Sequence, residues 1–130
     1  MLLPFGISLS FAQQHAPFKI SGEIQDAATH SPINWVRVTL CQLDSTQVGT
    51  PTLSKFLYYV IDPNEKPFRY RKVAQYALEA PAAKTYLIHA QRAGYEDLWQ
   101  RVELSDTTKE SDAFDLQLRV NNPVAAYALS

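Results

Sequence analysis

Apolar and polar side chains alternate along several short stretches of this chain, with the two-residue period of half-buried β-strands. Over Phe18–Gln25 the even-numbered residues form an apolar face and the odd-numbered residues a polar face. The same alternation runs through residues 34–42, where Val36, Val38 and Leu40 share a face. The segment between the two runs is rich in Asp, Ser, Pro and Asn, which are typical of turns. The two runs therefore predict two strands joined as a hairpin-like unit.

Further strands follow along the rest of the chain. The alternation is strong over Thr85–Gln91, Leu98–Leu104 and Ala113–Val120. Phe56–Ile61 is a short, very apolar run of strand-forming residues. We also expect a short edge strand near Gln47–Thr50. Turn-forming residues separate these stretches, as they do in folds made only of strands.

The stretch 68–80 allows two interpretations. Its composition permits a helix over Lys72–Glu79, but no N-cap precedes this segment and Pro81 ends it. A strand over Gln75–Ala80 is preferred, because apolar and polar residues alternate there. Six or seven short strands and no convincing helix predict an all-β, antiparallel two-sheet β-sandwich of about seven strands.

Length and net charge narrow the possible functions. A chain of 130 residues has room for one domain with a hydrophobic core. The net charge of −1 lacks the strong basic excess expected of a nucleic-acid-binding protein. No stretch reaches the roughly 18 consecutive apolar residues that a transmembrane helix needs. We therefore expect one domain that binds no nucleic acid and has no transmembrane helix of its own.

The N-terminal residues 1–12 differ from the rest of the chain. They are apolar and end in a small–aromatic–small sequence that polar residues follow. This pattern predicts a signal peptide, truncated at its start, that is cleaved after Ala12. The positively charged start of such a peptide is missing, because no Lys or Arg precedes Lys19, and a β-strand or a disordered arm is the alternative. Residues 13–17 are then a linker, and residues 121–130 are expected to be a disordered tail.

Several short motifs resemble those of one family, the carboxypeptidase regulatory-like domains. The motifs that carry the resemblance are ISGEIQDAAT at Ile20–Thr29, SPI at Ser31–Ile33, VRVTL at Val36–Leu40, YLIHA at Tyr86–Ala90 and GYE at Gly94–Glu96. They correspond to the family's opening strands, to a later strand and to its Gly-Tyr turn. The resemblance covers about residues 18–120, and it implies a transthyretin-like (prealbumin-like) Greek-key sandwich.

The resemblance also carries expectations about location, and it fails in the middle of the chain. The sequence LDST at 43–46 looks like versions of the domain at the N-terminus of Bacteroidetes outer-membrane β-barrel proteins. This implies an exported protein of the periplasm, outer membrane or cell surface of a Gram-negative bacterium, as an N-terminal fragment of a larger protein. At 51–72 the usual TDxxGxF segment of the family is replaced by a longer, aromatic and basic stretch. We expect this segment to set the protein apart from the family.

The sequence lacks the residue patterns of common catalytic and cofactor sites. His15, His30 and His89 are not spaced as a metal-binding pair. Cys41 has no local His partner that would make it a catalytic thiol. A Gly-rich phosphate loop and a G-x-S-x-G motif are also missing. We therefore expect no enzyme activity, no cofactor and no metal.

Outward-facing aromatic residues are the first candidates for ligand or partner contact. Trp35, Tyr58 or Tyr59, Tyr95 and Trp99 fall partly out of phase with the inward-facing positions. Such side chains stack on sugar rings, dock a partner or neighbouring domain, or simply cover the outer face of a sheet. Of Tyr58 and Tyr59, Tyr59 is taken as the candidate contact residue.

A cluster of cations supplies the remaining candidates. Lys66, Arg69, Arg71 and Lys72 place four cations within seven residues. They form either a solvated loop or a patch that contacts lipid headgroups or an anionic polymer. Arg69 and Arg71 are taken as the candidates. The function expected is a non-catalytic accessory or docking module that binds another envelope protein or a following domain, and the alternative is a carbohydrate-binding module that recognises a polysaccharide.

Overall fold

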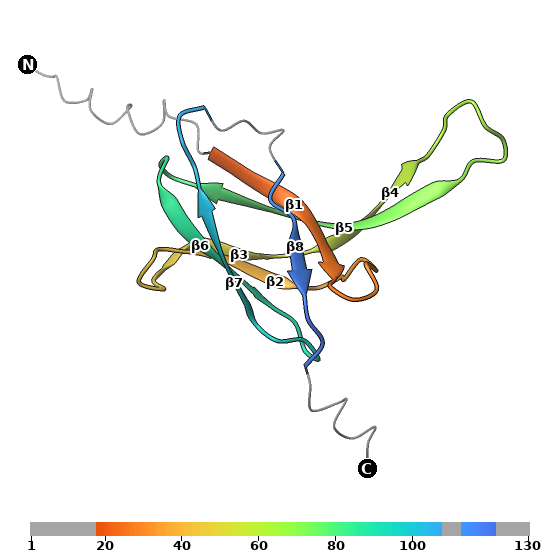
Figure 1. Ribbon diagram of the computed structural model, residues 1–130. Coiled ribbons are helices and arrows are strands. Elements are labelled where there is room, and N and C mark those ends of the chain that lie inside the picture. Colours follow the sequence, from red (N-terminus) through yellow and green to blue (C-terminus); the bar gives the residue numbers. More distant parts are fainter. Residues whose placement is uncertain (1–17, 108–112, 122–130) are drawn as a thin grey trace, which may run out of the picture.

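The computed structural model describes residues 18–107 and 113–121, which form an all-β sandwich of two four-stranded sheets (Figure 1). The strand order is β4-β5-β1-β8 in one sheet and β3-β2-β6-β7 in the other. The strands are β1 (Phe18–Asp26), β2 (Arg37–Cys41), β3 (Gln47–Leu53), β4 (Lys55–Val60), β5 (Tyr70–Ala80), β6 (Thr85–Gln91), β7 (Leu98–Glu103) and β8 (Leu116–Leu118). The predicted signal peptide, the predicted linker and residues 122–130 of the predicted tail lie outside the described residues.

The prediction of a β-sandwich is confirmed, with eight strands in place of about seven and with one parallel pair, β1 and β8, beside the predicted antiparallel pairs. The edge strand predicted near Gln47–Thr50 continues to Leu53 as β3. The strand predicted at Gln75–Ala80 begins earlier, at Tyr70, as β5. The helix alternative for residues 72–79 is wrong, because this segment pairs with β1 and β4.

The two opening strands lie in different sheets, which corrects the predicted hairpin-like unit. β1 pairs with β5 and β8, whereas β2 pairs with β3 and β6. The connection between β1 and β2 therefore crosses from one sheet to the other. Alternation could not reveal this crossing, because each strand needs only one buried face and either sheet provides it.

The hydrophobic core lies between the two sheets and is built from the inward-facing positions that the alternation marks. Fully buried side chains come from five strands and include Ile20, Ile24, Val38, Leu40, Ala80, Tyr86, Ile88, Ala90, Leu116 and Leu118. Burying one side chain of the size of Ile or Leu stabilises a fold by about 1.5–3 kcal/mol. These facing layers therefore hold the two sheets together.

Gly22 allows the chain segment before β8 to pack closely against β1. A Cβ atom at position 22 would lie only 2.2 Å from the backbone oxygen of Phe114. The Phe114 N–H donates to the Ser21 carbonyl at 2.9 Å, and the Tyr76 hydroxyl donates to the Phe114 carbonyl. Burial and the nearby Asp115 carboxylate raise the pKa of Tyr76 above its ordinary value. The neutral hydroxyl is thus kept as a donor, and the glycine makes room for the contact.

β5 joins the sandwich to a projecting hairpin. Residues 75–80 of β5 pair with β1, and its residues 70–75 pair with β4. The last pair between β1 and β5 joins Glu23 to Gln75. Beyond this pair the β4–β5 hairpin has no further strand beside β5, and it extends away from the sandwich (Figure 1).

Candidate functional site

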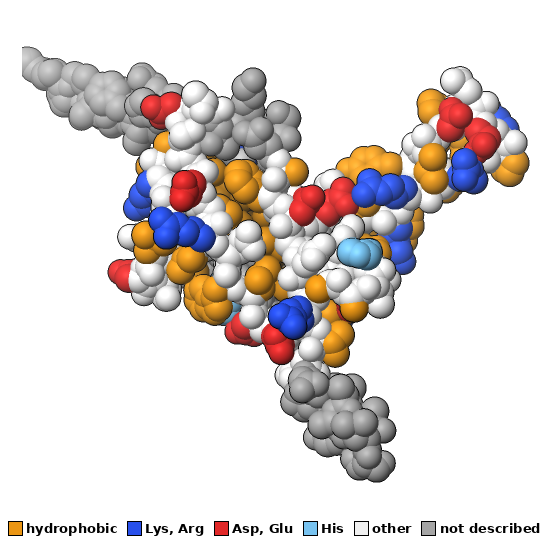
Figure 2. Space-filling model, viewed as in Figure 1, with side chains coloured by type: hydrophobic (Ala, Val, Ile, Leu, Met, Phe, Trp, Pro, Cys, Tyr) orange, Lys and Arg blue, Asp and Glu red, His pale blue; other side chains and the backbone are white. Residues whose placement is uncertain are grey.

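We call residues 56–72 the arm. It consists of the outer part of β4, a tip at residues 61–69 and the beginning of β5. Figure 2 shows it as a protrusion with hydrophobic and charged side chains at its end. Seven of the twelve large hydrophobic side chains that are exposed in the described residues belong to it, namely Leu57, Tyr58, Tyr59, Val60, Ile61, Phe68 and Tyr70. The arm therefore concentrates the exposed apolar surface of the described molecule.

Exposed apolar side chains lie on both faces of the arm. Tyr58, opposite Lys72 in the pairing register, lies on the face that continues the core side of the sheet, and its side chain is 63% exposed. Tyr59, opposite Arg71, lies on the other face and is 44% exposed. An apolar run in a sandwich strand normally has at least one face covered. Burial within this chain therefore does not explain the apolar character of the arm.

Two arginines of the arm form ion pairs. The Arg69 Nε atom lies 2.5 Å from Glu65 Oε1, within the arm itself. The Arg71 Nη2 atom lies 3.0 Å from Oε1 of Glu23 on β1. Both arginines are more than half exposed, so each pair stabilises the fold by at most about 1 kcal/mol. The main effect of these pairs is to orient the two guanidinium groups.

Two lysines of the arm lie over aromatic rings. The Lys66 ammonium is 5.0 Å from the ring centroid of Phe68, and the Lys72 ammonium is 4.5 Å from that of Phe56. Cation–π contacts at exposed sites contribute about 0.5–1 kcal/mol. The arm has four cationic and two acidic side chains, a net charge of +2 on a chain whose net charge is −1. All four cations thus have a partner in the arm or on β1.

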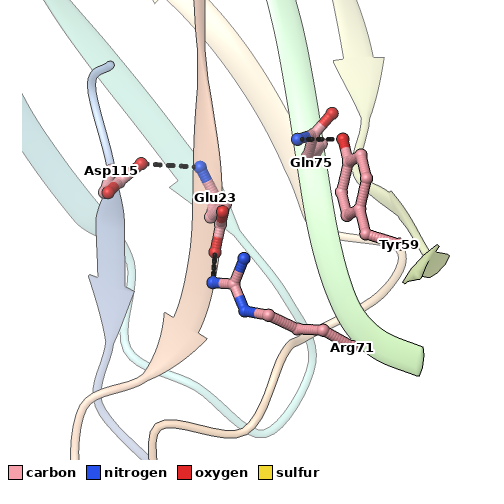
Figure 3. Close-up of polar contacts among 5 residues, drawn as sticks. All are labelled: Glu23, Tyr59, Arg71, Gln75 and Asp115. Atoms are coloured by element: carbon pink, nitrogen blue, oxygen red, sulfur yellow. Dashed lines mark hydrogen bonds and ion pairs between the residues drawn. The ribbon is translucent and has the colours of Figure 1, made fainter. Parts of the chain in front are cut away.

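Polar contacts at the base of the arm connect it to the sandwich (Figure 3). The Gln75 amide donates to the Tyr59 hydroxyl at 2.9 Å, across the β4–β5 pair. Arg71 contacts the Glu23 carboxylate, and the Glu23 backbone N–H donates to Asp115 Oδ1 at 2.9 Å. These contacts run from β4 across β5 and β1 to the segment before β8. These contacts hold the base of the arm in a fixed orientation relative to the sandwich.

A second candidate region is an open hollow of about 720 Å³ at one end of the sheet β3-β2-β6-β7. Trp35, Arg37, Gln91 and Asp97 are among the residues that line it. The Trp35 side chain is 56% exposed, and its backbone is left-handed with φ of 59°. This conformation costs a bulky residue on the order of 1–3 kcal/mol, and such strain is concentrated at functional sites.

Ser54 holds the strained backbone at Trp35. Its backbone oxygen accepts the Trp35 N–H at 3.1 Å. Its hydroxyl accepts the Val36 N–H and donates to the Ile33 carbonyl, both at 2.9 Å. Ser54 is fully buried and lies between β3 and β4, where the chain passes from one sheet to the other. One residue therefore positions both the exposed indole and the start of β4.

Tyr95 lines the hollow but is held by a structural contact. Its hydroxyl donates to Asp26 Oδ2 at 3.0 Å. Burial and this hydrogen bond raise the pKa of Tyr95. Asp26 Oδ1 accepts the backbone N–H groups of Thr29 at 3.0 Å and Ala28 at 2.8 Å, which lower the pKa of Asp26. Tyr95 thus fixes the turn after β1 against the wall of the hollow.

Trp99 lies on β7 beside His89 of β6. The two rings are stacked, with centroids 3.8 Å apart and an interplanar angle of 8°. The His89 Nε2 atom lies 2.9 Å from Oδ2 of Asp97, which also lines the hollow. The Trp99 side chain remains 46% exposed. Asp97 therefore connects the stacked pair to the region of Trp35.

The structure separates the six predicted contact residues into two regions. The arm holds Tyr59, Arg69 and Arg71, whereas Trp35 and Tyr95 line the hollow and Trp99 lies near its Asp97 wall. Sequence reasoning missed Tyr70, which is 58% exposed, and preferred Tyr59 to the more exposed Tyr58. Apolar residues at both odd and even positions of Phe56–Ile61 were the available signal, but a strand buried on both faces has the same pattern.

Comparison with known proteins adds no family assignment. No protein-family model matches the chain, and no curated protein matches it. The resemblance to carboxypeptidase regulatory-like domains therefore stays a prediction.

Three further observations concern only residues 18–107 and 113–121. No group of three or more His, Cys, Asp or Glu side chains there is arranged to hold a metal ion. No helix in this part of the chain is long and apolar enough to cross a membrane. Cys41 is buried and forms no disulfide, and burial raises the pKa of its thiol.

Proposed function

We propose that this protein is a non-catalytic β-sandwich docking module that contacts its partner through the arm. The observation that carries the proposal is the concentration of seven exposed large hydrophobic side chains on one projecting hairpin. These side chains, each about half exposed, present on the order of 600 Å² of apolar surface. Exposed apolar surface of this extent, here divided between the two faces of one hairpin, is typical of interaction sites on soluble proteins, because leaving it in water is unfavourable.

The cellular location and the kind of partner proposed for this module come from the sequence resemblance. Carboxypeptidase regulatory-like domains suggest an exported protein of the Gram-negative cell envelope. The partner in this proposal is another envelope protein or a domain that follows in a longer chain. The arm lies entirely within the segment 51–72 that departs from the family pattern, so the contact would be particular to this protein.

Site-specific photo-crosslinking in the bacterium that makes the protein tests the docking role. A photoreactive phenylalanine analogue replaces Tyr58 on the arm or, as a matched control, Arg101 on β7. The Arg101 side chain is also well exposed, at 63%. We expect cross-linked adducts of defined mass from position 58 and none from position 101. Equal adducts from the two positions, or none from position 58, would contradict the proposal.

A second candidate function, carbohydrate binding, is favoured by the strained and exposed Trp35 beside the hollow. Binding pockets for small ligands combine aromatic surface with a few convergent polar groups. The hollow offers the Trp35 indole together with the guanidinium of Arg37, the amide of Gln91 and the carboxylate of Asp97. This set suits a sugar, whose ring stacks on an indole and whose hydroxyls accept and donate hydrogen bonds.

Tryptophan fluorescence titration with soluble envelope polysaccharides tests this second function. We expect a saturable change in the wild-type chain, its loss in Trp35→Ala and its retention in the arm variant Tyr58→Lys. A wild-type chain whose fluorescence responds to no polysaccharide would contradict carbohydrate binding. That result would leave the docking role of the arm unaffected, because the two regions share no residue.

A further inference from the structure

The four edge strands of the two described sheets differ in how they discourage pairing with another chain. β8 has only three residues, β3 contains Pro51 and a left-handed Gly49 opposite a register shift, and β7 carries Arg101 and Glu103. Short length, proline, irregular pairing and charge are the usual protections of a sheet edge. β4 begins with one charged residue, Lys55, and the following Phe56–Ile61 contains no charged residue, no proline and no glycine. This part of β4 is thus the least protected of the four edges.

Backbone groups of β4 are available for a further strand. The Ile61 N–H donates to the Arg69 carbonyl at 2.9 Å, so it points toward β5. In an antiparallel pair the backbone groups of alternate residues point to opposite sides of the strand. The N–H and C=O groups of Phe56, Tyr58 and Val60 therefore point to the free edge. These three residues would form the hydrogen bonds to an added strand.

We propose that β4 of a second copy of this chain pairs antiparallel with β4, so that two arms form one four-stranded ribbon. The inference rests on the proposed docking role of the arm, and it assigns the arm a second copy of this chain as its partner in place of a different envelope protein or a following domain. In the register centred on Tyr58, this residue lies opposite the partner's Tyr58, and Phe56 lies opposite the partner's Val60. On the other face, Leu57 lies opposite the partner's Tyr59. Each of these pairs is apolar, and such cross-strand pairs stabilise a sheet.

The charges of the arm fit a second copy better than an anionic surface. The tip at residues 61–69 carries two acidic and two cationic side chains, so the part that would reach an anionic surface first is neutral. The cations Arg71 and Lys72 lie on β5, one strand away from the free edge. In the four-stranded ribbon the two β5 strands are about 14 Å apart, which exceeds the Debye length of about 8 Å. Repulsion between the two arms is therefore weak.

The exposed area is also sufficient for a pair of arms. Two copies together present on the order of 1,200 Å² of apolar arm surface, and pairing through β4 covers only the part of it beside the seam, which corresponds to the small interfaces of weak, transient complexes. A ribbon of two strands is marginally stable in water, whereas four strands with apolar faces are more stable. We expect a reversible dimer with a dissociation constant on the order of micromolar.

Sedimentation equilibrium of the purified full chain, over a concentration range that spans about 1 μM, tests the pairing. Tyr58→Lys places two ammonium groups opposite each other at the centre of the ribbon, and we expect it to weaken the dimer about tenfold or more. Tyr70→Lys is the matched control, because Tyr70 lies on the same face and is similarly exposed but belongs to β5. This control is expected to dimerise like the wild type. A wild-type chain that stays monomeric, or equal weakening by both variants, would overturn the inference.

A charge-exchange experiment distinguishes a specific loss of pairing from the misfolding of a variant. Tyr58→Lys and Tyr58→Asp chains should each be monomeric, whereas a mixture of the two should form a heterodimer. Failure of the mixture to associate would overturn the inference. A monomeric wild-type chain that still cross-links from position 58 to a different envelope protein would also overturn it, while leaving the docking role in place.

Discussion

The body of the sandwich and the arm use the same strand-forming residue types in opposite ways. Ile24 and Tyr86 are fully buried in the body, whereas Ile61 and Tyr58 on the arm are 51% and 63% exposed. The difference comes from neighbouring strands, because β1 accompanies β5 only as far as Gln75. Inside the sandwich these side chains stabilise the fold, whereas on the arm they are surface. Strand propensity alone therefore does not reveal what a strand contributes.

Truncating one isoleucine in the body and one on the arm should give the largest difference in the free energy of unfolding. Ile24→Ala removes a fully buried side chain, and we expect the free energy of unfolding to fall by about 2–5 kcal/mol. Ile61→Ala removes an exposed one, and the change should stay within about 0.5 kcal/mol. Urea unfolding followed by circular dichroism measures both values. A loss at Ile61 as large as that at Ile24 would show that the arm contributes to the core.

Ser54, which lies between β3 and β4, should have the next largest effect on the free energy of unfolding. Ser54→Ala leaves the buried N–H of Val36 without its hydroxyl acceptor, which costs about 1–3 kcal/mol of unfolding free energy. Thr50→Ala, at an exposed position of β3, is the control and should change stability by less than about 0.5 kcal/mol. Thermal unfolding measures both variants. Equal stability of Ser54→Ala and wild type would contradict the role of Ser54 in holding Trp35 and β4.

Acid should weaken the body through Asp26. Hydrogen bonds from the backbone N–H groups of Thr29 and Ala28 lower the pKa of this carboxyl below its ordinary value of 3.8. The stability that it contributes is therefore complete above that value and is lost as the pH falls through the lower pKa of the folded state. Asp26→Asn should be less stable than wild type at neutral pH, and the gap should narrow in acid. Unfolding curves at a series of pH values would contradict this if the gap stayed constant.

Much of the body could be predicted from the sequence, because burial of one face imposes a two-residue period. The inward positions of β1, β2 and β6 were all marked by alternation, including Ile20, Val38 and Ile88. Assignment of strands to sheets could not be predicted, since alternation records the burial of a face and not the neighbour that covers it. The crossing between β1 and β2 is therefore visible only in three dimensions.

The candidate regions were harder to predict for physical reasons. The segment 51–72 was expected to be distinctive, but Phe56–Ile61 has the same apolar pattern as a strand buried on both faces. The start of β5 was missed, because Lys72 interrupts the alternation of apolar and polar residues without preventing strand pairing. The strained backbone of Trp35 depends on hydrogen bonds to Ser54, which lies far along the chain. No local pattern around Trp35 records that contact.

The central claim is that the arm is a docking edge that the sandwich does not need for its own stability. Replacing residues 58–72 by Asn-Gly joins the paired residues Leu57 and Val73 through a two-residue hairpin turn. Removing the Arg71–Glu23 ion pair should cost at most about 1 kcal/mol. Sedimentation equilibrium of this shortened chain, with its unfolding temperature as the check on folding, is the most direct measurement. We predict a monomer at every concentration that unfolds within a few degrees of the wild type; a dimer as tight as that of the wild type, or a chain that no longer folds, would contradict the claim.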